Sequence, residues 1–174
     1  MAGAESNSTG VRALQWARAL EAELRWLGLG RDAGQDSSGN QESTFDEVVD
    51  DDDLIAISRD LFLHGHYSSA VLEAYKCLNN FVKGKSAVAD KDGAKLMNHV
   101  FSAKDPVLAV NELSSRSERD EQTGYMQIFA GAMTGIRNPR AHEHGYEDDP
   151  ASALELLGLA NHLMRVARRA TAPG

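Results

Sequence analysis

The chain has 174 residues, of which 42% are hydrophobic and 25% charged, the composition of an ordinary globular domain. Its net charge of -8 excludes a general electrostatic attraction to nucleic acid, so any RNA contact must depend on a local group of basic residues. The single cysteine, Cys77, excludes an intrachain disulfide, and neither a secretory signal nor a membrane span is recognisable. We therefore expect a cytoplasmic protein with no membrane partner.

The first third of the chain is predicted to hold one helix between two irregular segments. Residues 1–10 are small and polar and are expected to be disordered. Apolar residues recur at steps of three and four in residues 11–30, which predicts a helix. Residues 31–53 contain nine acidic residues and one basic residue, typical of a flexible acidic linker on which Phe45 and Val48 could dock. Its last four residues, DDDD, are interpreted as the charged start of a helix rather than as metal ligands.

Residues 54–170 are predicted to form one helical domain. Only 6% of the chain is aromatic, and Ala, Leu, Glu and Arg are plentiful, which favours helices over strands. Stripes of apolar residues at helical spacing begin at Leu54, Val71, Leu96, Tyr125 and Ala153. A short helix is also expected from Pro106, and Asp149 followed by proline is a typical helix start. The prediction is an all-α bundle of four to five main helices.

The segment GIRNPRAHEHGYEDDP, residues 135–150, joins the last two predicted helices. Because Pro139 restricts the residue before it, the incoming helix is expected to end near Arg137, which places Arg137 and His142 in a polar loop. A guanidinium has a planar set of donors suited to phosphate, and an imidazole transfers protons near neutral pH. The pair could cleave RNA without a metal, with Asn138 orienting either partner. Two such residues alone would fit a helix-capping or surface-loop role better.

Other charged residues of this segment have two interpretations each. His144 forms an H-x-H pair with His142, but a third metal ligand is missing from the pattern, so we expect no metal. Arg140 either binds phosphate or forms an ion pair with Glu143 or Glu147. The arginines between positions 165 and 169 either extend an RNA path or complement the dipole at a helix end.

Four blocks of the sequence resemble, in order, the Ymh-type branch of the HEPN superfamily, often described as abortive-infection or conserved hypothetical proteins. The blocks are LFLHGHYSSAVLEAYKCLNNFV, DGAKLMNHVFS, SERDEQTGYMQIFAGAMTGIRNPRAHE and DDPASALELLGLANHLMR, and they fall within residues 54–168. The resemblance implies a small helical bundle that forms homodimers, with the family motif at Arg137, Asn138 and His142. It also implies a metal-independent endoribonuclease without a cofactor, whose active site forms where the motif loops of two protomers meet.

The same resemblance implies an RNA substrate and a role in phage defence or in a toxin–antitoxin system, with an antitoxin or another defence protein as partner. Some HEPN toxins carry a modified tyrosine two residues after the histidine. Here Tyr146 lies four residues after His142, and we group it with Asn138, Arg140 and His144 as supporting or RNA-binding residues. The alternative is a non-catalytic dimerisation or regulatory module that binds a nucleotide or a partner protein. The acidic charge favours this module, whereas the intact arginine–histidine pair favours the enzyme.

Overall fold

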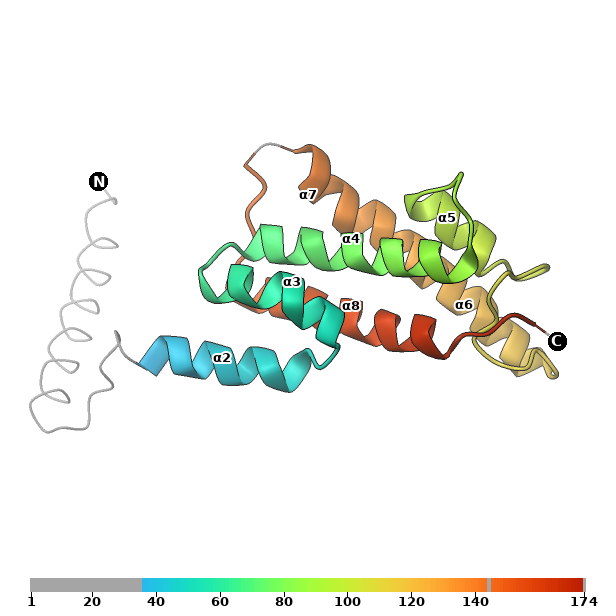
Figure 1. Ribbon diagram of the computed structural model, residues 1–174, viewed down its shortest axis with the longest axis horizontal. Coiled ribbons are helices and arrows are strands. Elements are labelled where there is room, and N and C mark those ends of the chain that lie inside the picture. Colours follow the sequence, from blue (N-terminus) through green and yellow to red (C-terminus); the bar gives the residue numbers. More distant parts are fainter. Residues whose placement is uncertain (1–35, 144, 174) are drawn as a thin grey trace, which may run out of the picture. The chain divides into compact units, whose positions relative to one another are not determined.

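The structure is a computed structural model that describes residues 36–143 and 145–173, with side chains from residue 42 onward. These residues are all-helical, as predicted, apart from one isolated antiparallel bridge between Ala109 and Thr171. The elements are α2 (Asp36–Val48), α3 (Asp52–Leu63), α4 (Tyr67–Ser86), α5 (Gly93–Val100), α6 (Arg116–Ala132), the π-helical turn η1 (Met133–Arg137), α7 (Asn138–His142) and α8 (Pro150–Arg169) (Figure 1). The predictions for residues 1–10 and 11–30 lie outside the described residues. None of the described helices combines the length and apolar character needed to span a membrane.

Helix α4 is the central element of the unit that begins at residue 42. It packs against α3 on one side and α8 on another, and it also contacts α5 and η1 (Figure 1). Of the predicted stripe, Val71, Ala74, Tyr75, Leu78 and Val82 are buried and Phe81 is half-buried, and Ala70 is buried beside them. Helix α8 likewise buries one face along its whole length. Since each fully buried large apolar side chain contributes about 1.5–3 kcal/mol, these two stripes form the core that holds the neighbouring helices in place.

The acidic run before α3 begins that helix, as its position in the sequence predicted. Asp51 is the N-cap and accepts hydrogen bonds from the backbone N–H groups of Asp53 and Leu54. Its carboxylate also accepts a hydrogen bond of 2.6 Å from Nε of Arg168, near the end of α8. Arg165 pairs with Asp50 in the same region. These two arginines therefore link α8 to the turn before α3.

The flexible linker expected over residues 31–53 does not hold for the part from residue 42 onward. Phe45 and Val49 are 0% and 1% exposed, and the Phe45 ring lies 5.4 Å from that of Phe62. The side chain of Asn161, itself buried, accepts from the backbone N–H of Asp51 and donates to the carbonyl of Val48. The expected docking of Phe45 and Val48 is confirmed, since Phe45 lies in the core and Val48 packs against it. The expected flexibility is wrong because the high acidic content hid a short apolar face, which α2 buries while its carboxylates remain outside.

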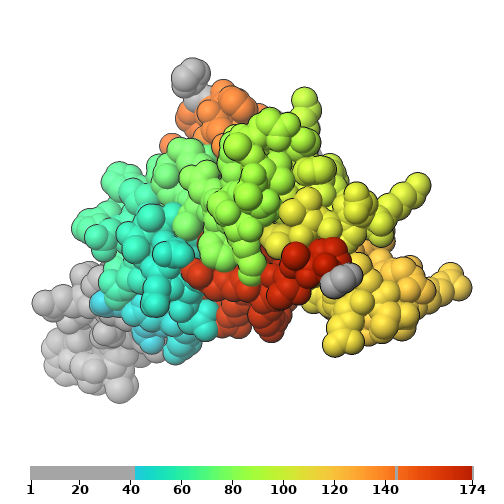
Figure 2. Space-filling model, turned by 45° about the vertical axis from the view of Figure 1, so that its right-hand side comes forward, coloured from blue at the N-terminus to red at the C-terminus, as the bar shows by residue number. Residues whose placement is uncertain are grey.

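The short helix expected from Pro106 is not formed. The side chain of Gln122 instead holds this segment in an irregular path, because it accepts from the N–H of Val110 and donates to the carbonyls of Phe101 and Leu108. The bridge to Thr171 adds hydrogen bonds of 2.7 and 3.0 Å between backbone groups. Figure 2 shows the resulting contact, in which the red C-terminal segment lies against the yellow segment before α6.

Candidate active site around Arg137 and His142

The arginine–histidine motif lies in a helix and not in the loop that the sequence predicted. Helix α6 continues through η1 into α7, and Asn138 keeps helical angles of φ -63° and ψ -45°. Its N–H donates to the carbonyl of Met133, five residues earlier. A proline normally breaks a helix because its ring clashes with the carbonyl four residues back. The wider π turn gives Pro139 room, which the sequence rule did not anticipate. Such turns occur often at functional sites.

Arg137 is the last residue of η1, and its side chain is held near the start of α5. The side chain is 20% exposed, and its Nη2 lies 3.9 Å from Oδ2 of Asp92. That separation allows electrostatic attraction but exceeds a hydrogen bond. Its Nε is buried without a hydrogen-bond partner among the described residues. Arg137 is therefore oriented by a charge while donors of its guanidinium remain unused.

Arg140, the second arginine of the motif, is fully engaged. Its Nε donates to Oδ2 of Asp148 at 2.7 Å, Nη2 pairs with the other carboxylate oxygen, and Nη1 donates to the carbonyl of Ile136 at 2.8 Å. The side chains of Arg140 and Asp148 are only 4% and 6% exposed. The Tyr146 ring covers the guanidinium at 4.7 Å. The ion-pair partner of Arg140 is thus Asp148, and neither Glu143 nor Glu147. Arg140 and Tyr146 contact each other, and this contact is structural.

The remaining motif residues lie at or near the surface. His142 is the last residue of α7 and is exposed, whereas Asn138 is half-buried at the start of that helix. His144 is not among the described residues. Five positions of a regular helix correspond to a rotation of about 140° and a rise of about 7.5 Å, so Arg137 and His142 leave the helix on different sides.

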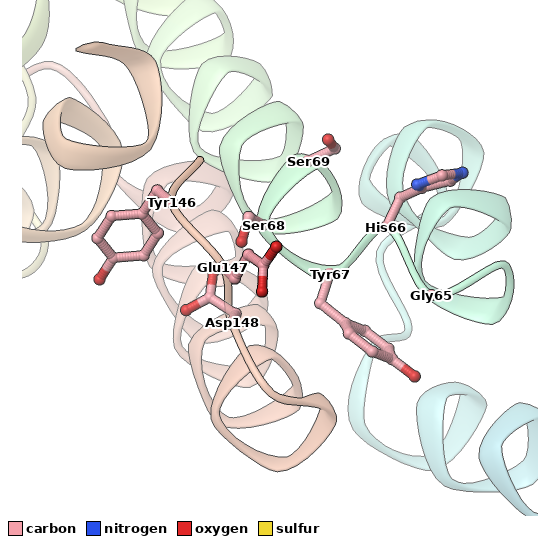
Figure 3. Close-up of a pocket in the computed structure, with 8 residues that line it drawn as sticks. All are labelled: Gly65, His66, Tyr67, Ser68, Ser69, Tyr146, Glu147 and Asp148. Atoms are coloured by element: carbon pink, nitrogen blue, oxygen red, sulfur yellow. The ribbon is translucent and has the colours of Figure 1, made fainter. Parts of the chain in front are cut away.

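A hollow of about 480 Å³ lies beside the turn that follows α7 (Figure 3). The residues around the start of α4 form one side, Gly65 to Ser69, and the segment Tyr146 to Asp148 forms the other. The hydroxyl of Ser68 is buried without a hydrogen-bond partner in the described part of the chain. Two carboxylates line this space, and one of them already pairs with Arg140. The acidic lining makes this hollow unsuitable for an RNA phosphate.

Sequence reasoning missed two residues that contact this region, Asn79 and Asp92. Asn79 lies in the buried stripe of α4 at 2% exposure, and its amide donates to Asp92 and accepts from the N–H of Gly93 at 2.9 Å. The sequence signal for Asn79 was its place between the buried apolar positions of α4. A buried amide needs hydrogen-bond partners, so such a residue indicates a specific contact. Those partners, Asp92 and Gly93, lie 13 and 14 residues further along the chain, so no local pattern identifies them.

Tyr75 is a buried residue whose hydroxyl interacts electrostatically with the charge of Arg140. Burial raises the pKa of Tyr75 well above its ordinary value, and the charge of Arg140 opposes this only in part. Its hydroxyl donates to the carbonyl of Leu156 at 3.0 Å. Tyr75 therefore stays neutral and is not a candidate for accepting a proton.

The described residues form a small all-helical domain, in which Arg137 and His142 lie between its last two long helices, α6 and α8. The family model described as "Protein of unknown function (Hypoth_ymh)" matches residues 50–166, and the chain belongs to this family. The Ymh-type resemblance of the sequence is thereby confirmed. No curated protein and no solved structure matches the chain.

Proposed function

We propose that this protein is a metal-independent endoribonuclease of the HEPN type, with Arg137 and His142 as its catalytic residues. The observation that carries the proposal is the state of the Arg137 guanidinium. It is mostly buried, faces a carboxylate at 3.9 Å, and retains an Nε without a partner among the described residues. Arg140 would have to break a two-bond ion pair to bind phosphate, whereas Arg137 would not.

The proposed reaction is attack by the ribose 2′-hydroxyl on the adjacent phosphorus. Neutral His142 takes the proton from that hydroxyl, the oxygen forms a bond to phosphorus, and the bond to the 5′-oxygen breaks. The products are a 2′,3′-cyclic phosphate and a 5′-hydroxyl, once the leaving oxygen has gained a proton. Arg137 supplies fixed positive charge and paired donors to the phosphate oxygens as negative charge develops on them.

A composite site formed by two protomers suits the helical position of the motif. Because Arg137 and His142 leave their helix on different sides, a phosphate that contacts both is reached more directly by residues from two copies. In a twofold dimer whose axis passes beside the motif helix, that helix meets its own copy in the partner subunit. The exposed position of His142 at the end of α7 suits such a contact.

The biological setting that accompanies this proposal is phage defence or a toxin–antitoxin system, with an antitoxin or another defence protein as partner. The second candidate is a non-catalytic HEPN module that binds a nucleotide or a partner protein. The net charge of -8 favours this second candidate, because an acidic protein repels RNA at long range. The partner-free donors of Arg137 suit both the endoribonuclease and the non-catalytic module, since a bound nucleotide also presents phosphate.

The deciding experiment is RNA cleavage in EDTA by the full chain and by an Arg137→Ala, His142→Ala double variant. The proposal expects the parent to cleave tRNA or a mixed-sequence RNA and the double variant to be inactive. The fragments should end in 2′,3′-cyclic phosphates, and the matching DNA should stay intact because it has no 2′-hydroxyl. A requirement for magnesium, or fragments with 5′-phosphates, would overturn the mechanism.

A further inference from the structure

Asp92 begins helix α5 but does not cap it with its side chain. Its angles, φ -149° and ψ 158°, are those of an N-cap residue, yet its carboxylate makes no capping hydrogen bond. Asp51 and Asp149, which are N-caps of two other described helices, each accept from two backbone N–H groups of their helices. Capping is the ordinary use of aspartate at this position. The carboxylate of Asp92 is therefore turned to other partners.

Asn79 fixes the direction of that carboxylate. Its side-chain Nδ2 donates to Oδ1 of Asp92, and its Oδ1 accepts from the N–H of Gly93 at 2.9 Å. Asn79 is 2% exposed, so it is held by the core of α4. Gly93 has φ +56°, a conformation that side chains disfavour, and this allows the turn to close against Asn79.

The second oxygen of Asp92 faces Arg137. Oδ2 lies 3.9 Å from Nη2 of Arg137, on the opposite side of the carboxylate from Asn79. A carbon added to Gly93 would lie 3.9 Å from Nη1 of the same arginine, so the guanidinium rests over this turn. A chain of contacts thus runs from the core of α4 through Asp92 to Arg137.

We propose that Asp92, anchored by Asn79, is a positioning residue that holds the Arg137 guanidinium in the orientation needed to bind a phosphate. This inference rests on the proposed function, since it concerns the same arginine. At 3.9 Å the carboxylate attracts the guanidinium without consuming the Nη donors that a phosphate would use. Without Asp92 the long arginine side chain samples other rotamers, and a displacement of about 1 Å at a reacting centre typically costs about 10²-fold in rate.

The test uses Asp92→Asn, which has nearly the same shape but lacks the charge. Asp90→Asn is the matched control, because Asp90 lies two residues earlier, is exposed, and pairs with Lys91 rather than Arg137. Both variants remove one negative charge from the same loop. Simple electrostatics predicts that both bind phosphate more tightly, whereas positioning predicts weaker binding for Asp92→Asn alone.

The primary measurement is the side-chain Nε–H signal of Arg137 in NMR spectra, assigned by its absence from an Arg137→Lys variant. Uridine 3′-monophosphate is titrated into the parent and both variants. We expect the signal to shift on titration in the parent and in Asp90→Asn. In Asp92→Asn the signal should already be displaced before titration, and its response should be weaker.

Cleavage rates are measured beside the spectra. We expect kcat/KM to fall roughly 10²-fold in Asp92→Asn, and Asp92→Glu to recover part of the loss. An unchanged Arg137 signal in Asp92→Asn, tighter binding than in Asp90→Asn, or no response in the parent would each overturn the positioning role. A parent that binds the nucleotide through Arg137 but cleaves no RNA would refute the nuclease and leave the positioning role supported.

Discussion

Arg140 and Asp148 close the turn between α7 and α8 through a two-bond ion pair that is almost completely buried. The ring of Tyr146 covers this pair, and the carbonyl of Ile136 accepts a further hydrogen bond from the same guanidinium. The end of α7, which carries His142, is thereby tied to the start of α8. The pair fixes the motif helix although it takes no part in the proposed chemistry.

Replacing Arg140 with alanine should lower the free energy of unfolding by about 3–5 kcal/mol, because the carboxylate of Asp148 would remain buried without its partner. Urea unfolding followed by circular dichroism measures this change. The control is Arg116→Ala, whose side chain is 93% exposed and should contribute less than about 0.5 kcal/mol. A loss of similar size in both variants would show that the burial of the Arg140 pair does not matter.

A second prediction concerns acid. Burial acts to raise the pKa of Asp51, but the hydrogen bond and charge of Arg168, with the amides of Leu54 and Asp53, outweigh it and lower the pKa below 3.8. The hydrogen bond from Arg165 likewise lowers the pKa of Asp50. A carboxylate with a lowered folded pKa stabilises the protein above its unfolded pKa, and this stability is lost as the pH falls through the folded value.

Unfolding free energy should therefore decrease as the pH is lowered from above 3.8 to below it. Asp51→Asn should flatten this decrease, since asparagine keeps the capping function and lacks the charge. Urea unfolding at a series of pH values gives the slope. Asp105→Asn, at an exposed position, is the control and should keep the parental slope. Identical slopes for all three proteins would contradict the role of the Asp51 pair.

Periodicity was sufficient to predict most of the helices, because α4 and α8 bury long regular stripes whose spacing is visible in the chain. It failed where the determining contact is distant. The helical face of α2 is short and set among many acidic residues, and the segment around Pro106 follows the hydrogen bonds of Gln122. The residues that order these two segments, Phe62 for α2 and Gln122 for the segment around Pro106, are distant in sequence. Local rules therefore predicted a linker and a helix instead.

The candidate site was predicted in the same uneven way. Arg137 and His142 were chosen from their chemistry together with the family resemblance, and their catalytic role stays a prediction. Their surroundings were not predicted, because the π turn that accommodates Pro139 depends on hydrogen bonding across several residues. The partners Asp148 and Asp92 were missed because only the folded chain brings them to the two arginines.

A third prediction concerns assembly. The proposed composite site requires a homodimer whose interface includes the helices that flank the motif, α6 and α8. Ile128 on α6 is 46% exposed and is suited to such an interface. Light scattering should give a dimer mass at micromolar concentration, and Ile128→Arg should shift it toward the monomer. Ile57→Arg, on α3 with 37% exposure, should remain dimeric. A monomeric parent would contradict the composite site.

The last prediction separates catalysis from stability at the motif. His142 is exposed, so His142→Ala should change the free energy of unfolding by less than about 0.5 kcal/mol. Arg137 is mostly buried, so Arg137→Ala should cost more through the lost packing of its side-chain stem. If both are catalytic, removing the proton acceptor should lower the rate about 10²–10⁴-fold, and removing the charge contact about 10²–10³-fold.

Arg137→Lys provides the sharper comparison within this prediction. Lysine keeps the charge that attracts Asp92 but lacks the planar donors, so stability should be largely retained while cleavage is lost. Melting curves and RNA cleavage are measured on the same samples. If the motif were only structural, the activity of each variant would fall in proportion to its unfolded fraction. A stable, fully active His142→Ala protein would remove His142 from the mechanism.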